Sequence, residues 1–293
     1  MPGKNRDMDM FRGAAQRESE LKWYAIADSA QHGALPNALV DKSRSVQCLF
    51  GASQGSPLAQ QSPHLVELCS PIEASNSWSW ISLNAKAKPC VSIIATNKTF
   101  EELFSQLSDC IEVVLPDGDA MYFAFWDPAI LGTLMGQADD QTLHVKGPVL
   151  NSRQRVKVIN EIKGWWYWDR IGEIHSIAPA GTDCHVNSKG IILSQKQVDD
   201  LVEASVPDHV SYYIKLNQPH LFGDASSEKR YSLVSHALVR ARAIGLSGMR
   251  DLVNYVCVEL IYKERINDEA VRRIFDDVKK GLLEFDAALD RLP

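Results

Sequence analysis

The chain has 293 residues, of which 45% are hydrophobic and 23% are charged, and its formal net charge is −6. This composition is typical of globular proteins and excludes a disordered chain, a collagen-like repeat and a coiled-coil rod. The apolar runs have strand length and fall far short of the roughly 20 residues that span a membrane. Basic and acidic residues are spread over both halves, which argues against nucleic acid or membrane insertion as the basis of function.

The start of the chain, residues 1–20, is polar and of mixed charge, and we expect it to form a flexible lead. It has no apolar core of a secretory signal, which indicates a cytoplasmic protein. The six cysteines are far apart and include no CxxC pair. We therefore interpret them as small apolar residues in a reducing compartment.

Residues 21–180 have the pattern of a mixed α/β (α+β) domain. The apolar runs 23–27 and 91–95 predict buried strands. Thr99 and Glu102 have the spacing of a capping box, in which each side chain bonds a free backbone N–H of the other residue. A helix is therefore expected to begin at Thr99.

A hairpin is predicted where the apolar runs 111–115 and 120–126 flank a short polar segment. This segment contains Asp117 and Gly118, and glycine accepts the positive φ angle that a tight turn requires. The two residues are therefore interpreted as structural.

The hairpin is followed directly by Trp126, Asp127 and Pro128. Aspartate is a favourable N-cap, and proline suits the first helical position because the N–H it lacks would be unbonded there. We predict that Asp127 and Pro128 begin a helix and that Trp126 packs against the sheet. Two or three further strands are expected over residues 143–178.

The C-terminal part has a purely helical hydrophobic period, which predicts an all-helical domain over residues 191–293. The joint between the two domains is predicted at residues 179–190, which are rich in Pro, Gly, Asp and Ser. Ser194 and Gln197 form another capping box. The last helix is expected to begin near Asp268.

Four consecutive aromatic residues stand out: Trp165, Trp166, Tyr167 and Trp168. In a strand, alternate members point to opposite faces of the sheet. One face can be core, while the other must meet a helix, a neighbouring domain or a partner, because monomers rarely expose large aromatic patches. Core packing and partner binding both remain open for these residues.

No familiar catalytic signature is present, such as a phosphate-binding glycine loop, a zinc-protease helix or a hydrolase nucleophile elbow. Asp183, Cys184 and His185 are adjacent, and they are either an incidental loop or a nucleophile beside a base. The eight histidines show no metal-binding spacing, so a metal site would require tertiary assembly. We predict no catalytic residue, no cofactor and no metal.

The segment VVLPDGDAMYFAFWDPAIL, residues 113–131, resembles the signature of the adaptor (effector chaperone) family of bacterial type VI secretion. Four other stretches agree in order: WYAIADSAQ (23–31), CLF (48–50), SPHLVEL (62–68) and VKGPVL (145–150). Together they cover about residues 21–170. One departure is that Ala124 and Ala129 stand where many relatives carry arginine, so contacts made through those arginines are not expected here.

The resemblance implies a cytoplasmic, non-catalytic protein with two protein partners: a toxin effector, which it stabilises, and the VgrG spike, onto which it helps to load the toxin. Two alternatives remain. One is a hydrolase-like enzyme with a site built by the fold, for which Asp183 or His185 could serve. The other is an immunity or regulatory binding protein. Given the aromatic block and a cleft expected between the two domains, we predict that the effector contacts Trp166 or Trp168.

Overall fold

The computed structural model describes residues 6–41, 44–179 and 190–293. The first part of the chain combines strands with helices, and the described residues beyond the last strand form helices. This confirms the predicted fold class, a mixed α+β domain followed by a helical one.

The chain divides into two compact units between Val202 and Glu203. This division lies within helix α6 (Gln195–Asn217) and not at the predicted joint. Residues 180–189, which make up most of that predicted joint, lie outside the described residues.

The centre of the first unit is a six-stranded sheet in which all neighbouring strands are antiparallel. In spatial order the strands are β2 (Val46–Cys48), β3 (Pro63–Leu68), β1 (Lys22–Asp28), β4 (Val91–Thr96), β7 (Ile162–Trp168) and β8 (Ile174–Ile177). The strands predicted at 23–27 and 91–95 are β1 and β4, the central pair. Both are buried on both faces, which explains their continuous apolar sequences.

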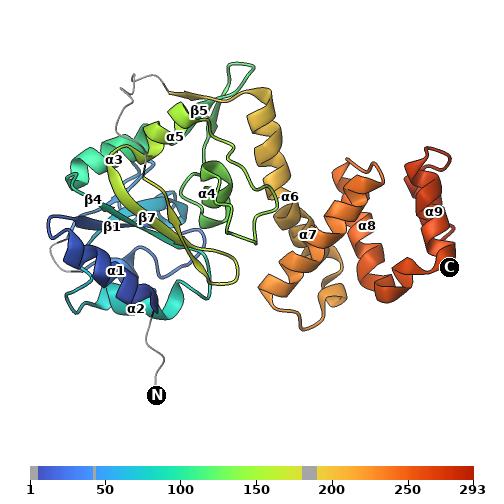
Figure 1. Ribbon diagram of the computed structural model, residues 1–293, viewed down its shortest axis with the longest axis horizontal. Helices are drawn as coiled ribbons and strands as arrows, with labels where there is room; N and C mark the ends of the chain where they lie inside the picture. Colours follow the sequence, from blue (N-terminus) through green and yellow to red (C-terminus); the bar gives the residue numbers. More distant parts are fainter. Residues whose placement is uncertain (1–5, 42–43, 180–189) are drawn as a thin grey trace. The chain divides into compact units, whose positions relative to one another are not determined.

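Helices cover both faces of this sheet (Figure 1). They are α1 (Arg6–Arg17) and α2 (Asn76–Asn84) on one face, and α3 (Phe100–Ser108), α4 (Pro128–Met135) and α5 (Ser152–Ile159) on the other. Two short 3₁₀ turns complete the layers, η1 (Asn37–Leu39) and η2 (Ala59–Gln61). Strand residues alternate between the two layers: Trp23 belongs to the core under α1, and Tyr24 to the core under α3.

The prediction of a flexible lead over residues 1–20 is wrong for its described part, because α1 is packed against the sheet. Met8, Phe11 and Ala15 are buried, and their spacing places them on one helix face. The ring of Phe11 lies 5.5 Å from that of Trp166. The apolar face of this helix is short and is interrupted in the sequence by charged residues, so the sequence pattern did not predict the helix.

Two strands, β7 and β8, confirm the expectation for residues 143–178. The same segment also contains a helix that was not predicted, α5, which begins with a capping box between Asn151 and Gln154. One expectation needs correction. The part from residue 191 is not entirely helical, because β9 (Ile191–Ile192) pairs with β5 (Glu112–Val114). Strand β5 also pairs with β6 (Ala120–Tyr122), which completes a small three-stranded sheet.

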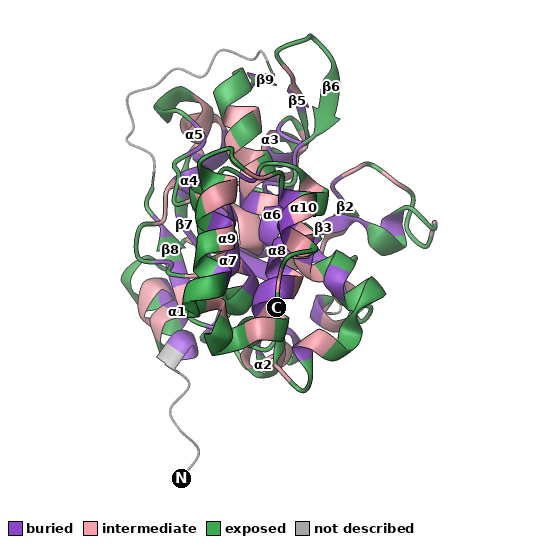
Figure 2. Cartoon of the chain, turned by 90° about the vertical axis from the view of Figure 1, so that its right-hand side faces the viewer, coloured by how far each residue is buried: buried purple, intermediate pink, exposed green. Residues whose placement is uncertain are grey.

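The second unit packs its helices around a core of its own. They are the C-terminal part of α6, then η3 (Pro219–Phe222), α7 (Ser227–Ala243), α8 (Met249–Tyr262), η4 (Lys263–Asn267), α9 (Glu269–Lys279) and α10 (Phe285–Leu289). Figure 2 shows α8 as the more buried helix and α9 as largely exposed. Asp268 precedes α9, as predicted, and the helix ends at Lys279, two residues before Gly281, whose φ is +69°.

His64 on β3 is a buried histidine that should make stability depend on pH. It is 5% exposed, its Nδ1 lies 3.0 Å from the carbonyl oxygen of Ser62, and burial lowers its pKa. The folded protein binds the His64 proton less tightly than the unfolded chain, in which the pKa of a histidine is about 6.5. Stability is therefore full above pH 6.5, and it is lost as the pH falls below that value, because protonation then favours the unfolded chain. We expect His64→Gln to flatten the fall in unfolding free energy between pH 7 and pH 5, measured by urea titration. The exposed His236→Gln should leave it unchanged.

Candidate functional site

The hairpin β5–β6 is held by the turn that contains Asp117 and Gly118. The φ of Gly118 is +94°, and its N–H donates to the carbonyl oxygen of Leu115 at 3.0 Å. The Asp117 Oδ1 accepts from the backbone N–H of Asp119 at 3.1 Å. These contacts give both motif residues a role in the turn.

The Asp-Pro pair lies where the chain passes from the hairpin into α4. Asp127 is the N-cap residue, and its Oδ1 accepts from the backbone N–H of Ala129 at 2.9 Å. Pro128 is the first residue of the helix, and Trp126 is buried against the sheet-side core. The geometry therefore gives Asp127 and Pro128 a structural role, which is to begin helix α4.

We expect Asp127→Ala to lower the free energy of unfolding by about 0.5–2 kcal/mol through the lost cap. Denaturant titration followed by tryptophan fluorescence measures this directly, because all seven tryptophans lie within residues 23–168. The effector binding that the resemblance implies should fall only as far as the folded fraction falls. Wild-type stability together with abolished binding would make Asp127 an interface residue.

The segment after α4 is fastened to that helix by backbone contacts. The N–H of Val149 donates to the carbonyl oxygen of Thr133 at 3.1 Å, and the Thr133 hydroxyl donates to the carbonyl oxygen of Val145 at 2.7 Å. At Gly147 a Cβ atom would lie 2.0 Å from the Thr133 carbonyl oxygen. The stretch VKGPVL therefore requires glycine for a close approach of two backbones.

Part of the motif is exposed on the surface. Tyr122 is 65% exposed, and Met121 beside it is also exposed. The Tyr122 ring lies 5.0 Å from that of Phe50, which in turn contacts the edge of Trp126 at 5.4 Å. Strand β6 thus presents aromatic and thioether groups, the side-chain types that are enriched in protein interfaces.

The aromatic block lies in β7 and is buried throughout. Trp165 and Tyr167 belong to the core under α3, while Trp166 and Trp168 belong to the core under α1 and α2. Trp166 stacks on Trp23 at 5.7 Å, and the Nε1 of Trp168 donates to Asp7 Oδ2 at 2.9 Å. A partner-binding role for these residues stays a prediction, and it would require displacement of the covering helices.

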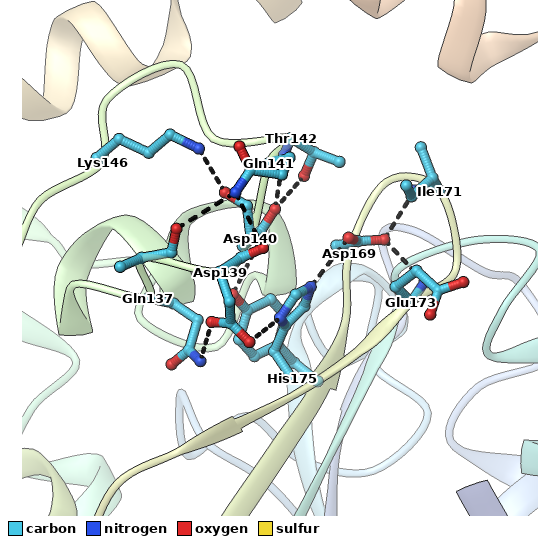
Figure 3. A network of polar contacts seen from close by, with 12 residues as sticks. Gln137, Asp139, Asp140, Gln141, Thr142, Lys146, Asp169, Ile171, Glu173 and His175 are labelled. Atoms are coloured by element: carbon cyan, nitrogen blue, oxygen red, sulfur yellow. Dashed lines mark hydrogen bonds and ion pairs between the residues drawn. The ribbon is translucent and has the colours of Figure 1, made fainter. Parts of the chain in front are cut away.

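A polar network that the sequence did not reveal lies where the β7–β8 hairpin meets the segment after α4 (Figure 3). Its central side chains are Asp140, Tyr167, Asp169 and His175, all buried. The Tyr167 hydroxyl donates to Asp140 Oδ2 at 2.9 Å. His175 bridges two carboxylates: its Nε2 lies 3.0 Å from Asp169 Oδ2 and its Nδ1 lies 3.3 Å from Asp139 Oδ2.

The network shifts the pKa values of His175 and Tyr167. Burial alone lowers the pKa of His175, but its hydrogen bonds to Asp169 and Asp139 and the nearby carboxylate charges more than offset this and raise it. Burial, together with the charge of Asp140, raises the pKa of Tyr167. The contacts of His175 with Asp139 and of Tyr167 with Asp140 fasten the residue 137–142 segment to the sheet.

Sequence spacing could not identify this network, because its members are far apart in the chain. A weak signal was available: a turn at residues 169–172 places His175 opposite Tyr167 in the antiparallel register. The cluster that was singled out, Asp183, Cys184 and His185, lies outside the described residues. Among the helices that the structure describes, none combines the length and the apolar character needed to cross a bilayer.

The fold and the motif define a two-unit protein whose first unit contains the β5–β6 hairpin and the Asp-Pro start of α4. Residues 23–144, from β1 to beyond α4, match the model of a family described as a domain of unknown function (DUF4123). Comparisons with curated proteins and with solved structures gave no match. The matched segment contains the hairpin, Asp127, Pro128 and the exposed Tyr122.

Proposed function

We propose that the protein is a cytoplasmic, non-catalytic adaptor of type VI secretion, which binds a toxin effector, stabilises it and helps to load it onto the VgrG spike. The observation that carries the proposal is the family match over residues 23–144. It coincides with the segment whose motifs resemble the adaptor family. The buried motif residues stabilise the fold, so the partner is proposed to bind exposed residues on the surface.

Exposed apolar side chains support a binding role. In the first unit they include Met121 and Tyr122 on β6. In the second unit Tyr212 and Leu216 are 61% and 64% exposed, and their spacing of four residues places them on one face of α6. Exposed apolar groups that lie together mark sites of protein interaction.

Loss of the gene provides the test in the cell. We expect the toxin encoded nearby to fall in abundance and to disappear from the secreted fraction, both measured by immunoblot. Other effectors of the same secretion system should be secreted as before, because an adaptor serves its own toxin. Unchanged secretion of the toxin would refute the adaptor function.

The exposed hairpin can be tested by one pair of variants. We expect Tyr122→Ala to weaken toxin binding about tenfold or more, measured by calorimetry, since exposed tyrosines are frequent binding hot spots. Ile171→Ala is the matched control, because Ile171 is 48% exposed and lies outside the family match. Equal affinities for the two variants would place the toxin elsewhere on the protein.

A further inference from the structure

We propose that Asp140, Asp169 and His175 form a binding site for one divalent transition-metal cation of the Zn²⁺ type. The site lies within the first unit, between the β7–β8 hairpin and the segment that follows α4 (Figure 3). The inference is independent of the adaptor function, because it concerns how this unit is held together.

The three side chains converge on one point. Each offers one ligand atom, and these atoms all lie within 4.8 Å of one another. Zn²⁺ binds imidazole nitrogen and carboxylate oxygen at about 2.0–2.2 Å, so ligands of one ion are about 3–4 Å apart. Asp169 Oδ2 and His175 Nε2 are already separated by 3.0 Å. Small side-chain movements therefore bring all three to bonding distance.

The remaining atoms of each ligand are anchored. Asp169 Oδ1 accepts from the backbone N–H groups of Ile171 and Glu173, both at 2.9 Å, which directs Oδ2 toward His175. Asp140 Oδ1 accepts from the backbone N–H of Thr142 at 2.8 Å and from its hydroxyl at 2.7 Å. The Oδ2 atom of each carboxylate takes no part in these bonds, although that of Asp140 accepts from the Tyr167 hydroxyl at 2.9 Å.

The histidine has the outer partner that metal-bound histidines usually have. Its Nδ1 lies 3.3 Å from Asp139 Oδ2, while Nε2 lies 3.0 Å from Asp169 Oδ2. A carboxylate on the far ring nitrogen fixes the orientation of the ring and makes it a stronger ligand. Asp139 itself is 68% exposed, so it can be altered without opening the core.

The charge balance favours a cation. Asp140, Asp169 and His175 are 1%, 3% and 7% exposed, and with the neutral imidazole that a metal ligand requires, the two carboxylates carry two negative charges. Buried charge is costly unless it is paired or bound to a metal. Imidazole among the donors, without a thiolate, suits Zn²⁺ and similar ions better than Ca²⁺ or Mg²⁺. Because the site is deeply buried, the bound ion would hold the segment after α4 against the β7–β8 hairpin.

Calorimetric titration of the chelator-treated full chain with zinc chloride tests the proposal. We expect one equivalent of Zn²⁺ to bind and the melting temperature to rise. Asp139→Ala should lower the affinity about 10–100-fold, as loss of an outer partner does, and Asp169→Asn should abolish binding. His236→Gln, which removes an exposed imidazole on α7, should bind as the wild type does.

Cobalt absorption provides a second readout that does not depend on any variant folding. With Co²⁺ in place of Zn²⁺, the wild-type protein should show the visible bands of nitrogen and oxygen ligation and no thiolate charge-transfer band. Absence of stoichiometric Zn²⁺ binding, a thiolate band, or unchanged affinity in folded Asp139→Ala would overturn the proposal.

Discussion

Trp168→Ala should lower the free energy of unfolding of the first unit by about 3–5 kcal/mol, the range for removing a buried tryptophan. Trp168 is 1% exposed, its ring lies 6.1 Å from that of Phe11, and its Nε1 donates to the buried Asp7. The substitution leaves a cavity beneath α1 and removes one of two partners of the buried Asp7 carboxylate, which also pairs with Lys86 at 3.2 Å. Denaturant titration followed by tryptophan fluorescence measures the loss.

Trp80→Ala is the matched control, because Trp80 lies on α2 but is only half-buried. Its effect should be clearly smaller than that of Trp168→Ala. If Trp168→Ala unfolded like the wild type and yet lost toxin binding, the partner-binding interpretation of the aromatic block would be correct and the core interpretation wrong.

Gly147→Ala should be the second strongly destabilising change. The φ of Gly147 is +67°, and a side chain in that region costs about 1–3 kcal/mol. The added Cβ would also meet the carbonyl oxygen of Thr133 at 2.0 Å, and forcing atoms into a packed interior costs typically about 1–3 kcal/mol more. The expected loss is measured by the same titration.

Gly118→Ala separates the two contributions. Gly118 also has a positive φ, +94°, but a Cβ atom there would have no neighbour within 4 Å. It should therefore show the backbone cost alone. Equal losses for the two variants would mean that the segment after α4 moves away from Thr133 without penalty.

The sequence predicts best where one local interaction decides the structure. The capping box of Thr99 and Glu102 and the N-cap at Asp127 are both present at the residues expected. Each depends on side chains within three residues of the backbone groups they bond. The buried strands β1 and β4 were equally predictable from the sequence, because a continuous apolar run of strand length is typical of a strand buried on both faces.

The errors arise where tertiary contacts decide. Helix α1 was read as a flexible lead because Met8, Phe11 and Ala15 are separated by charged residues, and their common face gains stability by covering Trp23 and Trp166. Helix α5 is polar enough to resemble a loop, and its capping box at Asn151 was the overlooked signal. For the aromatic block the sequence left core packing and partner binding open, and the structure covers its second face with α1.

The candidate site was the least predictable part. His175 contacts Asp169 across a hairpin turn and Asp139 through the chain that follows α4. These contacts depend on the strand register and on the course of the loop after α4, and the spacing of residues in the sequence predicts neither. The motif residues, in contrast, could be identified from the sequence. In the structure Asp117 and Gly118 form a turn, and Asp127 caps a helix.

Co-purification of the untagged toxin with the tagged protein, after expression together, tests the adaptor function most directly. The account predicts a complex of fixed stoichiometry that persists through size-exclusion chromatography, with a higher soluble yield of toxin than in its absence. Tagged Tyr122→Ala should retain less toxin than tagged Ile171→Ala. Separate elution of the two proteins, with a toxin yield that is unchanged by the presence of the partner, would contradict it.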